Sequence, residues 1–110
     1  MGRDSESFYI GLMAFSIHIS TEARDDIQQA ILWYNGRKKG LGRNFFSAVQ
    51  SAIQVLKVNP FFQIRYDNIR CLPVPKFPYM LHFSVDPAQQ QVNIYAVLNT
   101  YRDTDAKDRT

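Results

Sequence analysis

Apolar and polar residues alternate over residues 15–20, and this period of two is typical of a strand that is buried on one face. The spacing then changes, because apolar residues recur every three or four positions over 21–35 and again over 42–58. That second period is typical of amphipathic helices. The pattern therefore predicts a strand followed by two helices.

Capping residues mark the ends of both predicted helices. Ser20 or Thr21 precedes an acidic first turn, which favours a helix start, and Asn35 with Gly36 is a common helix end. The second helix stops before Pro60, since the residue before a proline is disfavoured in helical geometry. Each helix carries one apolar stripe that we expect to face a sheet: Ala23, Ile27, Ala30, Ile31 and Tyr34 on the first, and Phe45, Val49, Ala52, Ile53 and Leu56 on the second.

Four segments after residue 60 are rich in β-branched and aromatic residues and are separated by turn residues. They span 61–67, 69–74, 79–86 and 92–99. Prolines between 73 and 78 predict that the second segment is an edge strand or ends early, because proline cannot donate to a sheet. We therefore predict an α+β fold: a strand, an antiparallel two-helix hairpin, and a three- to four-stranded antiparallel meander packed on the helices.

The 110 residues predict a single domain over 13–103, with an N-terminal extension at 1–12 and a polar tail at 104–110. The extension lacks periodicity and Met13 precedes the first strand, so we expect either a leader or remnant, or one additional strand. Hydrophobic residues make up 45% of the chain and charged residues 21%, as in soluble globular domains. The lone Cys71 favours the cytoplasm, and no apolar run is long enough to cross a membrane.

Positive charge is concentrated in the centre of the chain. Between residues 37 and 102 there are nine basic and two acidic residues, a net charge of +7, whereas the whole chain carries +3. This asymmetry indicates either an anionic partner, nucleic acid or an acidic protein segment, or a solvated surface. Four of the basic residues surround the predicted interhelical turn, where they either contact phosphates or lie in a solvated loop: Arg37, Lys38, Lys39 and Arg43.

Six short blocks follow one another along the chain: WYN at 33–35, GLGRNFF at 40–46, NP at 59–60, IRYDNIR at 64–70, KFPYMLHFSVD at 76–86 and AVLNTYRD at 96–103. In this order and spacing they resemble the RelE/ParE superfamily of toxins. The resemblance runs from Phe15 to Asp103 and implies the same α+β fold. It also implies a toxin of a type II toxin–antitoxin system, held inactive in a hetero-oligomer with a cognate antitoxin.

The resemblance leaves the toxic activity open. RelE-like members cut mRNA in the ribosomal A site without a metal or other cofactor, by aligning the RNA 2′-OH with the adjacent phosphate and using basic side chains to stabilise charge. ParE-like members instead inhibit DNA gyrase. A third alternative is an inactive toxin-like protein that only binds its antitoxin. None of the three involves a membrane.

The resemblance also places individual residues. Arg102 falls on the family's basic position after the last strand, and Tyr79 stands where RelE-like nucleases have an arginine. Asn99 occupies a position that is often histidine in related toxins. The +7 charge of the central segment favours a nuclease, whereas the departure at 79 favours the other two alternatives.

Four further residues are candidates for the same catalytic site. Arg65, Arg70 and Lys76 lie on neighbouring predicted segments, so we expect a phosphate-binding patch with the arginine at 102, unless Arg70 pairs with a carboxylate. His82 alternates with apolar residues and is either a solvent-facing or hydrogen-bonded structural histidine or a catalytic one. Cys71 has no histidine nearby in the sequence and no CxxC spacing, which predicts a buried or passive thiol.

Overall fold

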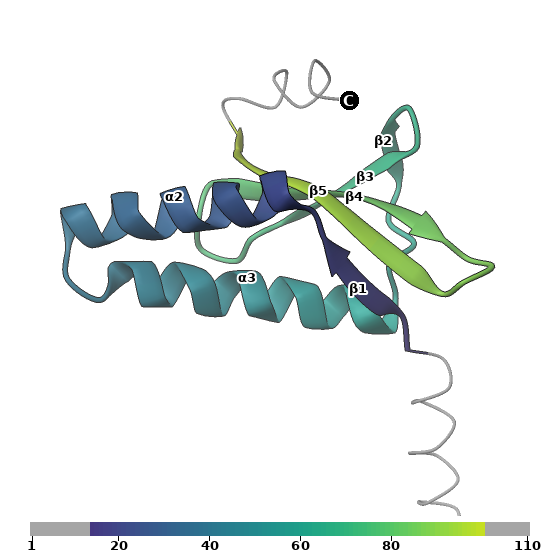
Figure 1. Cartoon of the computed structure of the whole chain (residues 1–110), viewed down its shortest axis with the longest axis horizontal. Helices are drawn as coiled ribbons and strands as arrows, with labels where there is room; N and C mark the ends of the chain where they lie inside the picture. The colour runs from purple at the N-terminus through teal and green to yellow at the C-terminus, as the bar shows by residue number, and fades with distance from the viewer. Residues whose placement is uncertain (1–13, 101–110) are drawn as a thin grey trace, which may run out of the picture.

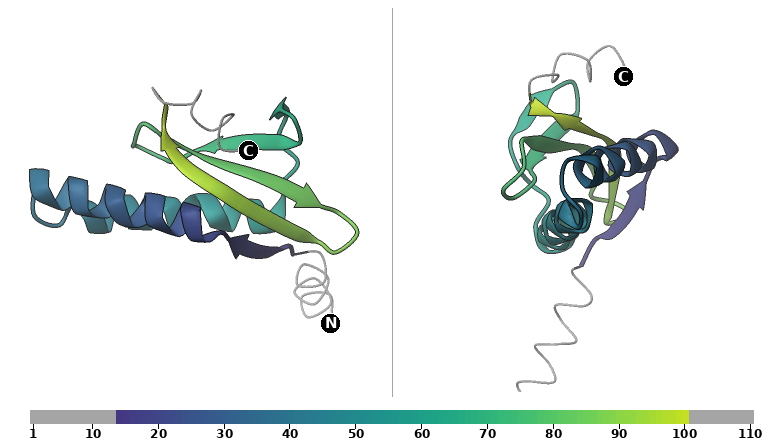
Figure 2. Two further views of the ribbon diagram at one scale, coloured as in Figure 1. Left: turned by 45° about the horizontal axis from the view of Figure 1, so that its top comes forward. Right: turned by 90° about the vertical axis from the view of Figure 1, so that its left-hand side faces the viewer.

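The computed structural model describes residues 14–100, which fold into two helices packed against one face of a five-stranded sheet (Figure 1). Figure 2 shows the two layers from the side and from the end. No helix within this described part is long and apolar enough to span a bilayer. In chain order the elements are β1 (Ser16–Ile19), α2 (Thr21–Arg37), α3 (Leu41–Val58), β2 (Ile64–Tyr66), β3 (Ile69–Pro73), β4 (Tyr79–Asp86) and β5 (Gln91–Asn99).

The strands are ordered β1-β5-β4-β3-β2. β1 lies parallel to β5, and all other neighbours are antiparallel, so the sheet is mixed. The predicted α+β fold is confirmed, with four strands in the meander. Of the two alternatives for the 69–74 segment, the edge position is wrong, because the three-residue β2 covers its outer side. Its early end is confirmed, since β3 stops at Pro73.

The predicted helix starts and ends agree with the structure to within two residues. The Ser20 hydroxyl caps α2 by accepting a hydrogen bond from the Ala23 N–H at 3.0 Å. α2 continues through Gly36 to Arg37 before it ends. α3 follows Gly40, whose φ of 87° is left-handed and suits a residue without a Cβ.

The hydrophobic core lies between the helix pair and the sheet. Most of the predicted stripe residues are buried there, although Ile31 and Ile53 are only partly buried at its margin. Tyr34 and Phe45 stack at 5.4 Å between ring centroids, and Tyr79 at the start of β4 meets the Phe45 ring edge-on at 5.0 Å. These aromatic contacts attach the helix pair to the meander.

A β-bulge divides β5 into two halves. Ile94 pairs with Phe83 and Ala96 pairs with His82, so Tyr95 is the extra residue on the bulged strand. Because of this extra residue, the side chains of Tyr95 and Ala96 both lie on the sheet face away from the helices.

β1 pairs with the first half of β5 and stops where the bulge begins. Beyond that point the start of α2 supplies the hydrogen bonds that another strand would make. The Ser20 hydroxyl donates to the Tyr95 carbonyl at 3.2 Å, and the Asp26 carboxylate accepts from the Val97 N–H at 3.0 Å. The helix thereby satisfies part of an otherwise open strand edge.

Candidate functional site

The sheet face away from the helices carries a cluster of polar side chains from three adjacent strands. Tyr66 comes from β2, Cys71 from β3 and His82 from β4. Nδ1 of His82 lies 3.1 Å from the Tyr66 hydroxyl and 3.3 Å from the Cys71 sulfur. The antiparallel register places Cys71 directly opposite His82, so the two side chains must share this face.

The His82 side chain is polar but only 1% exposed, so it is buried beneath this face of the sheet. A phenolic O–H is a stronger donor than a thiol S–H. An unprotonated Nδ1 accepts the Tyr66 hydroxyl proton more strongly than the Cys71 thiol proton, and both groups lie beside this nitrogen. A histidine nitrogen held beside a tyrosine hydroxyl in this way is a common arrangement for proton transfer.

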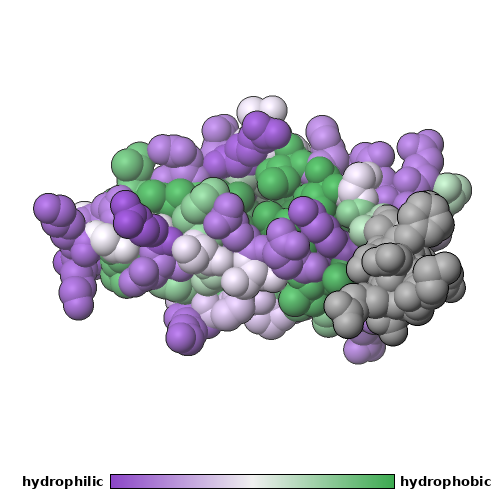
Figure 3. Space-filling model, turned by 90° about the horizontal axis from the view of Figure 1, so that it is seen from below, coloured by the Kyte–Doolittle hydropathy of each residue, from purple (hydrophilic) through white to green (hydrophobic). Residues whose placement is uncertain are grey.

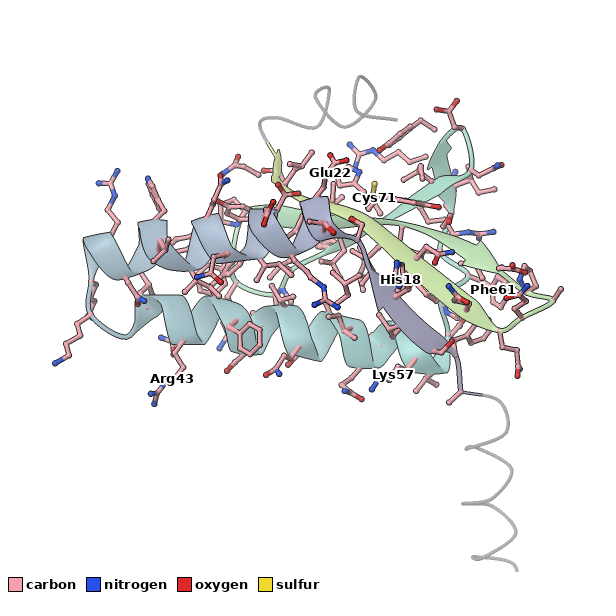
Figure 4. The ribbon with its side chains drawn as sticks, viewed as in Figure 1. His18, Glu22, Arg43, Lys57, Phe61 and Cys71 are labelled. Carbon is pink, nitrogen blue, oxygen red and sulfur yellow. The ribbon has the colours of Figure 1, made fainter. Side chains whose placement is uncertain are left out.

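A groove of about 450 Å³ runs beside this cluster, lined by Phe62, Gln63, Ile64, Arg65, Cys71 and Met80. Arg65 is exposed on the edge strand β2, and Tyr66 next to it is half-buried. Arg65 therefore lines the same groove as Cys71, which is a direct neighbour of His82. Cys71, labelled in Figure 4, lines the same groove and lies on β3.

Arg70 lies on the neighbouring strand but is held in a structural contact. Its Nη1 donates to the Phe62 carbonyl at 2.7 Å, and the guanidinium carbon lies 5.5 Å from the centre of the Phe61 ring. Phe61 is labelled in Figure 4 on the segment that leads into β2. Arg70 therefore attaches this segment to β3, and its predicted pairing with a carboxylate is replaced by a carbonyl.

Lys76 is located away from the other basic candidates. It follows β3 in the turn before β4, with a φ of 68°, and lines a different groove against Asn44 and Ser47 of α3. Arg65 lies at the opposite end of β3, beside the β2–β3 turn. The expected patch of Arg65, Arg70 and Lys76 is therefore not assembled by the described residues, because β3 separates its two ends.

Tyr79 and His82 lie on opposite faces of β4, as residues three apart on a strand do. Tyr79 packs toward Tyr34 and Phe45 in the helix layer, whereas His82 joins the cluster on the other face. The solvent-facing alternative for His82 is wrong because both strands beside it bury the ring, and the hydrogen-bonded alternative is correct. Arg102 lies outside the described residues, as do the 1–12 extension and the 104–110 tail.

Two features of the site were missed in the sequence. The sequence pattern does not single out Tyr66, and it predicts a buried or passive thiol for Cys71 because no histidine is near it in the chain. The β3–β4 register pairs Cys71 with His82 across a turn rich in proline. A hairpin centred on that turn would have predicted the pair, since residues equidistant from the centre of a turn face each other.

A separate groove of about 500 Å³ lies between α2 and the second half of β5. Its lining combines Asp26 and Gln29 with exposed Trp33 and the strand residues Val97 and Leu98. Burial raises the pKa of Tyr34, which also lines this groove, and proximity to Tyr79 raises it further. Residues 14–100 contain no group of three side chains suited to hold a metal ion.

Comparison with known proteins finds similarity of fold, but no similarity of sequence to a known family. No protein-family model and no curated protein matches the sequence. The chain is similar to a chain of the chromosomal ParDE TA system from P. aeruginosa, with 16% identity, a TM-score of 0.59, and coverage of 79% of this chain and 97% of that one. It is also similar to a chain of the toxin–antitoxin complex RelBE2 from Mycobacterium tuberculosis, with 19% identity, a TM-score of 0.55, and coverage of 78% and 91%. The likeness covers nearly the full length of each of the two neighbouring chains. The described domain has the RelE/ParE fold.

Proposed function

We propose that this protein is the toxin of a type II toxin–antitoxin pair and that a cognate antitoxin neutralises it. The proposal is supported by the RelE/ParE fold, by the six sequence blocks that resemble the family, and by structural neighbours that come from toxin–antitoxin systems. Induction of the full chain in a bacterial host is expected to arrest growth. Normal growth of cells that contain the soluble, folded protein would contradict the proposal.

We further propose that the toxic activity is metal-independent RNA cleavage on the sheet face away from the helices. The observation that carries this proposal is the Tyr66 hydroxyl held 3.1 Å from Nδ1 of His82, beside a groove lined by Arg65. A basic side chain for the phosphate and an oriented proton-transfer group are the two components that this chemistry requires.

Each residue has a defined role in the proposed step. The RNA 2′-oxygen forms a bond to the adjacent phosphorus as the bond from phosphorus to the 5′-oxygen breaks. Tyr66 accepts the 2′-OH proton while its own proton passes to Nδ1 of His82, and the leaving 5′-oxygen takes a proton from water. Arg65 holds the phosphate and stabilises its growing charge. His82 acts through Tyr66 and is therefore a positioning residue.

A matched pair of tyrosines tests these assignments. Tyr66→Phe removes only the hydroxyl and is expected to lower cleavage about a hundredfold, the usual scale for a lost proton-transfer group. Tyr95→Phe removes a hydroxyl from the same sheet face, where it contacts the Ser84 hydroxyl at 3.0 Å, and is expected to leave cleavage unchanged. Equal cleavage by the two variants would contradict the role of Tyr66. His82→Gln should lower the rate and flatten its pH profile.

Arg102 adds a second arm to the same experiment. The resemblance places it on the family's basic position, so Arg102→Ala is expected to lose on the order of a hundredfold in cleavage while remaining folded. Unchanged toxicity in a folded, expressed variant would remove Arg102 from the site.

Gyrase inhibition is the competing activity, and one observation favours it. Arg70 and Tyr79 are both engaged in packing or hydrogen bonds and Lys76 lies apart, so residues 14–100 do not assemble the basic patch expected for a nuclease. Mapping of mRNA ends and of gyrase-linked DNA breaks after induction separates the two activities. DNA breaks without new mRNA ends would replace the cleavage proposal.

We propose that the antitoxin binds in the groove between α2 and β5 and extends toward the basic residues of the meander. The groove offers apolar side chains for a helix, and the second half of β5 lacks a β1 neighbour. Acidic antitoxin residues are expected to cover Arg65, Arg70 or Arg102. Hydrogen exchange on the complex should show added protection in α2, α3, and the 62–72 and 92–102 segments. Protection confined to residues 1–12 would contradict this arrangement.

A further inference from the structure

The turn between α2 and α3 carries a second concentration of positive charge, remote from the sheet. Arg37 ends α2, Lys38 and Lys39 form the turn, and Arg43 lies in the first turn of α3; all four are exposed. Figure 1 shows that this end of the helix pair projects beyond the sheet, and Figure 4 shows Arg43 pointing outward there. We call these four residues, together with Trp33, the basic tip.

The charge of the basic tip is not neutralised by neighbouring carboxylates. Residues 27–66 contain no aspartate or glutamate. None of the four cations forms an ion pair with a carboxylate within residues 14–100. Seen from below, hydrophilic side chains cover this end of the molecule (Figure 3). A cluster of unpaired cations on a projecting end attracts polyanions.

An exposed aromatic ring lies at the base of the same tip. Trp33 is 52% exposed, and the Arg37 guanidinium carbon lies 4.4 Å from the centre of its ring. The Tyr34 ring meets Trp33 edge-on at 5.0 Å and holds it from the core side. The indole is therefore fixed in place while much of its surface remains open, as in a platform on which a base stacks.

The backbone reinforces the positive potential at this point. α3 begins at the basic tip, and its N-cap residue Gly40 offers no side-chain oxygen to the first N–H groups. The Gly42 N–H is already bonded to the Asn35 side chain at 2.9 Å. The partial positive charge of the helix start therefore adds to the four side-chain charges.

We propose that the basic tip binds single-stranded RNA, with phosphates against Lys38, Lys39 and Arg43 and one base stacked on Trp33. Cations combined with an exposed aromatic ring are characteristic of surfaces that bind single strands without reading their sequence. This site is distinct from the Tyr66–His82 site, and its binding of RNA does not depend on whether the protein cleaves RNA.

Fluorescence anisotropy with the full chain and a labelled decamer of 2′-O-methyluridine measures this binding without cleavage. Single-strand affinity falls with salt with a slope of about −0.7 for each phosphate contact. Lys38→Gln with Lys39→Gln is therefore expected to reduce that slope by about 1.4 and to weaken binding by roughly tenfold near 0.15 M salt. Trp33→Ala should weaken binding by about tenfold with little change in slope.

The matched control is Arg24→Gln with Lys57→Gln, which removes the same charge far from the tip; Figure 4 shows Lys57 at the opposite end of α3. This control is expected to change the affinity by less than about twofold, the scale of distant screened charges. Equal weakening by the two double variants, or no weakening by either, would overturn the proposal. Two outcomes would overturn the assignment to RNA. One is tighter binding of a thymidine decamer than of the RNA decamer. The other is binding of an acidic peptide that the Lys38 and Lys39 changes weaken while RNA binding stays the same.

Discussion

Gly42 lies where α3 approaches the backbone of α2 closely, and Gly42→Ala tests that contact. A Cβ at this position would lie 2.6 Å from the Ile31 carbonyl oxygen and 2.7 Å from the Asn35 side chain. Ordinary van der Waals contact begins near 3.4 Å, so the helices must separate by roughly 0.8 Å. The Ile31 oxygen belongs to the backbone of α2 and cannot rotate away.

The expected cost follows from two opposing terms. Overpacking a close contact destabilises by about 1–3 kcal/mol, and a backbone obstacle favours the upper part of that range. Alanine recovers up to about 1 kcal/mol of helix propensity. Gly42→Ala is therefore expected to lower the free energy of unfolding by about 1–2 kcal/mol and Tm by roughly 10 °C. Separation of the helices also strains the hydrogen bond from the Gly42 N–H to Asn35.

Gly36→Ala is the matched control, because nothing lies within 4 Å of its Cβ and the residue is helical. It should leave stability unchanged or raise it by up to about 1 kcal/mol. Urea denaturation followed by far-UV circular dichroism measures both variants against the parent. The reasoning is refuted if Gly42→Ala is as stable as Gly36→Ala, since the close approach of the helices would then be absent.

Three further changes test the packing of the helices on the sheet. Asp26→Ala leaves the part-buried Val97 N–H without its carboxylate acceptor, so urea denaturation should show a loss of about 1–3 kcal/mol; parental stability would mean that α2 does not support β5. Leu56→Ala should cost about 2–5 kcal/mol because Leu56 is fully buried, and Ile53→Ala should cost less because Ile53 is only partly buried; the reverse order would indicate a different orientation of α3. The raised pKa of Tyr34 favours its neutral form in the folded state, so stability is complete below the ordinary tyrosine pKa of 10.0 and declines as the pH rises above it. Tyr34→Phe should reduce that alkaline decline, and an identical pH profile in the two proteins would exclude Tyr34 as its source.

The helices could be predicted well because several local signals agree at each end. The apolar period, the Ser20 cap and the Pro60 stop all indicate the same boundaries, and the structure places the ends within two residues of them. α2 continues past Gly36 because one glycine near a helix end costs only about 1 kcal/mol. The edge-strand prediction for β3 failed because strand order depends on long-range pairing, and β2 is too short to give a strong pattern of its own.

The candidate site could be predicted only in part, for a similar reason. The two arginines of the block IRYDNIR were predicted site residues, but the side chain that contacts His82 belongs to Tyr66, which lies between them. Arg70 is held in a structural contact because Phe62, eight residues earlier in the chain but adjacent in space, offers it a carbonyl at 2.7 Å. Contacts of this kind depend on the backbone conformation of the 60–63 loop, and the hydrophobic pattern of the sequence does not predict that conformation.

The face of β4 on which residue 79 lies determines which surface the tyrosine there affects. A residue at the start of β4 points toward the helices, where Tyr79 meets Phe45 at 5.0 Å, whereas His82 points to the other face. An arginine in place of Tyr79 would therefore lie beside the groove between α2 and β5 and not beside the Tyr66–His82 pair. The departure at position 79 consequently bears on the surface proposed for the antitoxin. The cleavage site that we propose instead consists of Tyr66 and His82, with Arg65 lining the groove beside them, and it lies on the opposite face of the sheet.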